Sequence, residues 1–163
     1  MTAVRRGLEA LIPALRRFAR ALTREKEAAD DLVQDTLVRA LRAEHLFHGG
    51  DLRGWMFTIL LNLDRNRRRG LARRPHMAVI EDVDPAGEPG GDGSGRDIDR
   101  GLAMLPSEQR EVLLLVTLEG MSYREAAEAQ GVPVGTVMSR LSRARATLRS
   151  HLDGERPRLR RVQ

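Results

Sequence analysis

The sequence lacks cysteine altogether and is poor in aromatic residues. Its 163 residues include one tryptophan, one tyrosine and three phenylalanines. Without cysteine the chain can form no disulfide, no thiol nucleophile and no cysteine-based zinc site. With so few aromatic rings, its hydrophobic cores must be built from Leu, Val, Ile, Ala and Met, a composition that suits packed helices.

Long apolar segments are absent as well. No apolar run approaches the roughly 20 residues that cross a membrane, and charge interrupts the N-terminal stretch too early for a signal peptide. We therefore expect a soluble, cytoplasmic protein that does not insert into a membrane. The sequence offers no catalytic constellation, and His45 and His48 have no further ligands beside them. We expect no enzyme activity, no cofactor and no metal.

Positive charge is abundant and unevenly distributed. The chain carries 28 basic and 23 acidic residues, for a net charge of +5. Residues 1–75 hold 16 basic and 9 acidic side chains, residues 76–99 hold one and seven, and residues 100–163 hold 11 and seven. Two basic segments joined by an acidic one are typical of proteins that bind nucleic acid.

The most informative stretch runs from Leu105 to Leu152, where three helical patterns follow one another. Ser122 and Glu125 have the spacing of a capping box, Gly131 suits a turn with positive φ, and Pro133 can start a helix. This order predicts a helix-turn-helix, whose last helix enters the major groove of DNA. An ordinary helical hairpin with a solvated arginine face is the alternative. The predicted buried stripe of the last helix comprises Val137, Leu141, Ala144 and Leu148. Its donor-rich face comprises Thr136, Ser139, Arg140 and Arg143.

Two helices are predicted in the N-terminal part. Apolar residues keep helical spacing from Leu8 to Leu22, and Pro13 marks either the start of that helix or a bend in it. A second helix should run from about Glu25 to Arg42. Its predicted buried stripe comprises Ala29, Val33, Leu37, Ala40 and Leu41. Another face gathers Asp31, Gln34, Asp35 and Val38. This acidic face is either an ordinary solvated surface or a dock for a basic partner.

A third helix is predicted from Leu52 to about Arg69, with Asp51 as a possible cap. Arginines on it can neutralise phosphates, and Asn, Thr or Trp side chains can meet an unstacked base, so the helix fits single-stranded DNA. Of Trp55 and Phe57, we expect one to lie in the core. The polar ridge comprises Thr58, Asn62, Arg65 and Arg69, with Arg67 and Arg68 beside it.

Helical periodicity breaks between Leu71 and about Asp99. This segment is rich in proline and glycine and poor in apolar residues, which predicts a flexible acidic linker without regular structure between about Pro85 and Gly95. A short helix should resume near Ile98. We therefore predict an all-α fold of two small helical domains. The predicted division is 1–75 for the first domain, 76–99 for the linker, 100–152 for the helix-turn-helix domain and 153–163 for a basic tail.

Three motifs together resemble the bacterial RNA polymerase sigma factors of the extracytoplasmic-function (ECF) group. They are DDLVQDTLVRAL (Asp30–Leu41), DLRGWMFTILLNLDRNRRR (Asp51–Arg69) and LPSEQREVLLLVTLEGMSYREAAEAQGVPVGTVMSRLSRAR (Leu105–Arg145). The resemblance implies a promoter-specificity subunit that binds the clamp and flap of core RNA polymerase. It would recognise the −35 and −10 promoter elements, help open the DNA, and bind an anti-sigma factor as a further partner.

The resemblance also assigns residues. The polymerase clamp would be bound by Asp31, Gln34, Asp35 and Val38. The −10 element would be bound by Trp55, Thr58, Asn62, Arg65, Arg68 and Arg69. The −35 element would be bound by Thr136, Met138, Ser139, Arg140 and Arg143. Many members of the family have Lys or Arg where this chain has Met138, so a cationic contact of the family is missing here or replaced by an apolar one. The acidic linker would follow the RNA path of the polymerase.

Two other functions fit parts of the sequence. A stand-alone helix-turn-helix regulator would bind duplex DNA tightly without polymerase. A sigma-like decoy would sequester an anti-sigma factor, although such decoys usually carry an attached receiver domain. The basic residues on both expected DNA faces favour the sigma factor over the decoy.

Overall fold

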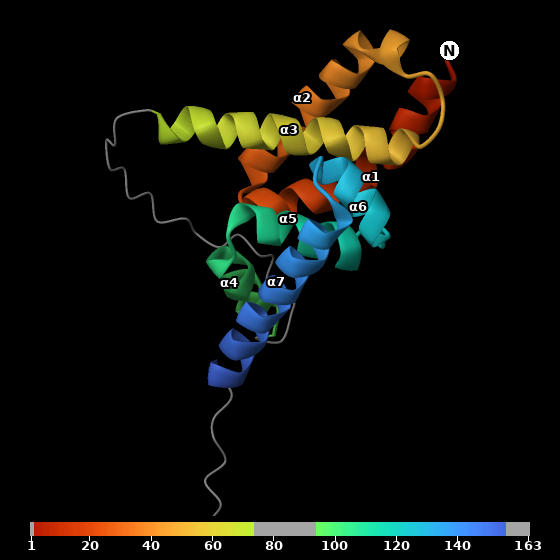
Figure 1. The fold of residues 1–163 in the computed structure, drawn as a ribbon. Coiled ribbons are helices and arrows are strands. Elements are labelled where there is room, and N and C mark those ends of the chain that lie inside the picture. The colour runs from red at the N-terminus through yellow and green to blue at the C-terminus, as the bar shows by residue number, and fades with distance from the viewer. Residues whose placement is uncertain (1, 74–93, 156–163) are drawn as a thin grey trace, which may run out of the picture.

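The structure is a computed structural model of the chain, and it describes residues 2–73 and 94–155. All regular secondary structure in these two ranges is helical, which confirms the predicted all-α class. The helices are α1 (Ala3–Thr23), α2 (Lys26–Arg42), the short 3-10 helix η1 (Glu44–Leu46), α3 (Leu52–Ala72), α4 (Ser94–Met104), α5 (Ser107–Thr117), α6 (Tyr123–Gln130) and α7 (Val134–Glu155) (Figure 1).

The first helix runs through its proline. Pro13 lies on an exposed side of α1, and the helix continues past it to Thr23, so the alternative in which the helix starts at Pro13 is wrong. Its start is capped by the side chain of Thr2, which accepts the backbone N–H of Arg5 at 3.3 Å. Arg24 ends it in a left-handed conformation with φ 60°.

Helices α2 and α3 bury one side each against α1. The buried side of α2 differs from the predicted stripe at Leu41, which is 41% exposed because it lies one residue, and so about 100° of helix rotation, beyond the buried Ala40. On α3, Phe57 is fully buried and meets the ring of Phe18 edge-on, with centroids 5.0 Å apart. Trp55 is only half-buried, so one aromatic residue of the pair is in the core, as expected.

Helix α4 begins earlier than the sequence indicated. It starts at Ser94, so the last residues of the predicted 76–99 linker are helical, while residues 74–93 lie outside the described part. Gly101 lets α4 approach α7 closely, because a Cβ at that position would lie 2.6 Å from Leu148 Cδ2.

One arginine of α5 connects the C-terminal end of α1 with the C-terminal end of α4. The guanidinium of Arg110 donates to the backbone oxygens of Leu22, Leu102 and Leu105 at 3.1, 2.8 and 3.1 Å. The Leu22 carbonyl lies in the last turn of α1, where carbonyls lack an intrahelical partner, and the bond from Arg110 satisfies it. Burial is the main cause that lowers the pKa of Arg110.

The two predicted domains pack against each other. Helix α3 lies across α6, and α1 lies against α5 (Figure 1). Buried apolar residues from both halves form one continuous cluster. The sequence left open whether the halves are packed or apart, and the structure answers that they are packed.

Candidate nucleic-acid interface

The predicted helix-turn-helix is present as α6 and α7. The Ser122 side chain accepts the N–H of Glu125 at 3.1 Å, and the Glu125 carboxylate accepts the N–H of Ser122 at 2.7 Å, which completes the capping box. Gly131 ends α6 with φ 67°, a conformation that glycine adopts without a Cβ clash. Ala127 is buried in the middle of α6, and the N–H of Val132 in the turn donates to its carbonyl at 3.0 Å.

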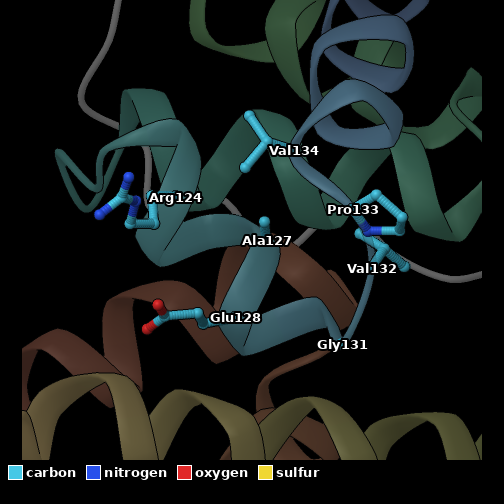
Figure 2. A pocket seen from close by; sticks show the side chains of 7 residues that line it. All are labelled: Arg124, Ala127, Glu128, Gly131, Val132, Pro133 and Val134. Atoms are coloured by element: carbon cyan, nitrogen blue, oxygen red, sulfur yellow. The ribbon is translucent and has the colours of Figure 1, made fainter.

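A shallow hollow opens beside this turn. Figure 2 shows that its walls come from α6, from the turn and from the first residue of α7, with Arg124 on one side and Val132 and Pro133 on the other. The hollow is open to solvent and has a mixed apolar and charged lining. It marks the side of the motif on which α7 begins.

The predicted −35 residues on α7 differ in exposure and in their hydrogen bonds within the chain. Arg143 and Met138 are exposed, as is Ser139, whose hydroxyl donates to the carbonyl of Thr136 at 3.1 Å. Arg140 is half-buried and donates to Gln130 Oε1 at 3.4 Å. The opposite side of the helix is buried through Val137, Leu141 and Ala144, as the periodicity indicated.

The predicted −10 residues lie along α3, and their environments differ. Asn62 and Arg69 are exposed. Thr58 is half-buried and its hydroxyl donates to the carbonyl of Gly54 at 2.9 Å. Trp55 packs against Phe47 with ring centroids 5.2 Å apart, which leaves part of the indole accessible.

The other two −10 candidates, Arg65 and Arg68, point into the junction between the halves. Both bind the fully buried carboxylate of Glu111 on α5, each with a shortest N–O distance of 2.8 Å. Arg68 also pairs with Asp64 at 2.8 Å, one turn back on α3. Arg65 donates in addition to the backbone oxygen of Gln130 at 3.2 Å.

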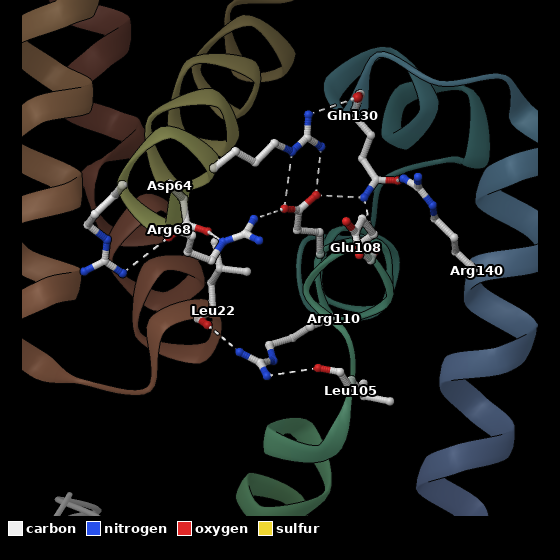
Figure 3. Close-up of polar contacts among 11 residues, drawn as sticks. Leu22, Asp64, Arg68, Leu105, Glu108, Arg110, Gln130 and Arg140 are labelled. Carbon is white, nitrogen blue, oxygen red and sulfur yellow. Dashed lines mark hydrogen bonds and ion pairs between the residues drawn. The ribbon is translucent and has the colours of Figure 1, made fainter. Parts of the chain in front are cut away.

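These contacts continue into α7, the helix predicted to enter the major groove, which we call the reading helix. Gln130 donates through Nε2 to Glu111 at 3.0 Å and accepts from Arg140 through Oε1. Figure 3 shows the resulting chain of polar contacts across α3, α5, α6 and α7. One buried carboxylate therefore connects candidate residues of the −10 surface with a candidate residue of the −35 surface.

A second buried carboxylate joins the halves elsewhere. Glu119, in the segment between α5 and α6, pairs with Arg17 of α1 at 3.1 Å and with Arg53 of α3 at 2.9 Å. The Arg53 guanidinium also lies 5.6 Å from the centroid of the Phe57 ring. Both carboxylates thus take their cations from the N-terminal half.

Glu111, Glu119 and Gln130 are not among the residues predicted from the sequence. A signal was present for the first: Glu111 directly precedes the apolar run Val112–Val116, and it lies among core residues of α5. A buried carboxylate requires a cationic partner. The identity of the partner could not be read from the sequence, since Arg65 is 46 positions away.

The acidic face of α2 has the exposure that a docking surface requires. Its predicted members Asp31, Gln34, Asp35 and Val38 are all exposed. No ion pair or hydrogen bond within the described residues engages these four side chains. Separately, in residues 2–73 and 94–155 no helix is long and apolar enough to span a membrane, and no group of His, Asp or Glu there could hold a metal.

Comparison with known sequences matches both halves. A family described as Sigma-70, region 4 matches residues 95–148, and one described as Sigma2 domain of PhyR matches residues 8–61. The ECF RNA polymerase sigma factor EcfG of Rhodopseudomonas palustris (strain TIE-1) is 39% identical over 162 residues, covering 93% of this chain and 87% of that one. RNA polymerase sigma factor HrpL of Pseudomonas syringae pv. syringae is 37% identical, covering 87% and 83%.

Solved structures agree in fold. The sigma factor RpoE of Bartonella quintana, in complex with the anti-sigma factor NepR, superposes with a TM-score of 0.76 at 34% identity, covering 93% of this chain and 98% of that one. CnrH, in complex with the cytosolic domain of CnrY, gives a TM-score of 0.69 at 30% identity, covering 94% and 89%.

Proposed function

The chain belongs to the ECF group of RNA polymerase sigma factors, and from this premise we propose how its surfaces divide the work of a promoter-specificity subunit. Such a subunit binds core RNA polymerase, recognises the −35 and −10 promoter elements and helps open the DNA. We assign the acidic face of α2 to polymerase, the ridge of α3 to the −10 strand and the outward side of α7 to the −35 duplex.

The acidic face of α2 is suited to a protein partner rather than to DNA. Asp31 and Asp35 are exposed and pair with no cation in residues 2–73 and 94–155, and they lie beside the exposed apolar Val38. Negative charge repels phosphates, whereas a basic surface of polymerase would be attracted to it and oriented by it. The mixture of carboxylates and an apolar residue is typical of an interface.

The two proposed DNA-binding surfaces differ in how accessible their contact residues are in the free chain. On α7, Met138 and Arg143 are already exposed. On α3, Asn62 and Arg69 are exposed, but Arg65 and Arg68 are held by Glu111. Phosphates of a −10 strand would compete with this carboxylate for the same guanidinium groups. The occupation of these two arginines is the observation that carries our proposal, because it favours a subunit that acts with polymerase over a stand-alone regulator.

The length of a promoter gives a second reason. The −35 and −10 elements lie roughly 25 base pairs apart, or roughly 85 Å at about 3.4 Å per base pair. Helices α3 and α7 have 21 and 22 residues and are each about 32 Å long. While α3 is packed on α6, the two surfaces cannot reach both elements at once. The halves must separate, and the 20 residues between Arg73 and Ser94 can span at most about 70 Å when extended.

Further features follow from this role. An anti-sigma factor is expected as a partner, since the related RpoE and CnrH were each solved with a bound protein, described for RpoE as an anti-sigma factor. Polymerase and promoter DNA place the protein in the cytoplasm. As a specificity subunit it would catalyse no reaction itself and would require no cofactor.

Reversal of the charge on α2 tests the proposal. We expect the double variant Asp31→Lys, Asp35→Lys to lose transcription in a reconstituted assay with core polymerase, because its docking face now repels a basic partner. A chain with Glu9→Lys and Asp99→Lys has the same net charge and changes exposed residues of α1 and α4 in place of the acidic face, so it should remain active. Circular dichroism should show the same helical content in both.

Equal transcription by the two double variants would contradict the assignment of α2. If the wild-type chain supports no promoter-specific initiation with any bacterial core RNA polymerase, the proposed function itself is contradicted.

A further inference from the structure

Two apolar side chains project from the start of the reading helix. Val134 and Met138 are 40% and 53% exposed, and their spacing of four residues puts them on the same side of α7. The core side of the helix is already filled by Val137, Leu141 and Ala144, so Met138 is not a displaced core residue.

The polar neighbours of Met138 are committed to the chain itself. The hydroxyl of Ser139 donates to the carbonyl of Thr136, and Arg140 donates to Gln130. In helix-turn-helix proteins the first turns of the reading helix contact the base edges. In the first two turns of α7, Met138 is therefore the long side chain that is free to project toward them.

An apolar side chain in the major groove has one matching base feature. Thymine alone among the four bases presents a methyl group there, whereas guanine presents two acceptors that favour Arg or Lys. Methionine is unbranched and flexible, so it can adapt its position to such a methyl group. We propose that Met138 makes this chain select thymine at one position of the −35 element, on either strand, by contact with the C5-methyl group. The inference rests on the proposed assignment of α7 to the −35 element.

The first step of the test finds the position. Holoenzyme reconstituted with core polymerase transcribes a promoter library in which the −35 region is randomised, and the transcribed templates are sequenced. Met138→Lys should replace a thymine preference by a guanine preference at one position, and Met138→Ala should flatten it. Met104→Lys is the matched control, because Met104 is 57% exposed but lies on α4.

The second step removes the methyl group alone. Deoxyuridine replaces the selected thymine in an otherwise unchanged promoter, and a thymine outside the element is replaced in a control template. Wild-type holoenzyme should lose about fourfold in promoter affinity, the equivalent of about 0.8 kcal/mol for one buried methylene-sized group. Holoenzyme carrying Met138→Ala should show no difference between the two bases.

The outcomes separate this inference from the function on which it rests. If wild-type holoenzyme binds the thymine and deoxyuridine promoters equally, or if Met138→Ala leaves every −35 preference unchanged, the thymine contact is refuted while the sigma function stands. If the wild-type chain directs no transcription from any template of the library, the proposed function fails, and this inference with it.

Discussion

At the scale of single residues, three buried carboxylates determine how the chain is held together. Asp64, Glu111 and Glu119 are each buried, and each binds two arginines. The planar guanidinium satisfies carboxylate oxygens with directed hydrogen bonds, which offset the cost of removing a carboxylate from water. The arginines themselves keep part of their surface exposed, so another anion can approach them.

Arg143 is the exposed cation of the predicted −35 set, and its removal should relax base selection. We expect Arg143→Ala to cost roughly 1–3 kcal/mol of promoter binding and to broaden the preference at one −35 position, if the contact is to a base edge. Arg149→Ala removes an exposed cation six residues further along α7 and should act uniformly on all sequences or not at all. Binding of holoenzyme to single-base variants of the promoter measures both. Unchanged preferences at every position in Arg143→Ala would rule out base reading.

Glu125 gives the helix-turn-helix a small dependence on pH. Its hydrogen bonds with the backbone and side chain of Ser122 lower its pKa in the folded chain. A depressed carboxyl pKa stabilises the fold above the unfolded value of about 4.3, and this contribution is lost as the pH falls through the folded value. The difference in melting temperature between wild type and Glu125→Ala should therefore be larger at pH 7 than near pH 3. A difference that grows on acidification would contradict this role.

At the scale of elements, much of the fold follows from local patterns, and the contacts between the halves do not. Ser122, Gly131 and the spacing of Val137 and Leu141 predicted the helix-turn-helix because caps and periodicity act within a few residues. The start of α4 was misplaced because Gly95 and its neighbours have weak helix propensity, and packing against α7 outweighs it. The pairing of α3 with α5 and α6 depends on charges far apart in the sequence, for which local pattern gives no rule.

Helix α3 serves both as the proposed −10 surface and as part of the junction, so weakening the junction should expose the surface. We expect Glu111→Gln to lower the free energy of unfolding by about 1–3 kcal/mol, because it removes the negative charge that neutralises Arg65 and Arg68. The isolated variant should at the same time bind a short single-stranded oligonucleotide several-fold more tightly, since both arginines lose their ion pair with Glu111. Arg65 then keeps its bond to the backbone oxygen of Gln130, and Arg68 keeps its ion pair with Asp64. Thermal melting and fluorescence anisotropy measure the two effects.

The control for this experiment lies one turn away. Glu108→Gln makes the same chemical change on the same helix, but its side chain is exposed and forms no ion pair in the described residues. Both variants gain the same net charge, so a general electrostatic effect on DNA binding would appear equally in both. Identical affinities for the oligonucleotide would show that Glu111 does not withhold the arginines.

At the scale of the whole molecule, the two halves of the free chain are packed together, whereas binding both promoter elements at once requires them to separate. Its two halves share one hydrophobic cluster and two buried ionic networks. Promoter elements roughly 85 Å apart cannot be reached by surfaces that stay in contact. A single helix-turn-helix also buries little surface on DNA, and specific complexes usually need more. Polymerase resolves both difficulties if it binds α2, fixes the spacing of the halves and adds its own contacts to DNA.

The most direct test compares the same promoter with the isolated chain and with the reconstituted holoenzyme at physiological salt. The promoter is first identified by mapping transcription start sites with the holoenzyme. Footprinting should then show protection of the −35 and −10 elements by the holoenzyme and no specific protection by the isolated chain at nanomolar concentration. A specific footprint of the isolated chain on the duplex at that concentration, retained in the Asp31→Lys, Asp35→Lys variant, would contradict the account and favour a stand-alone regulator.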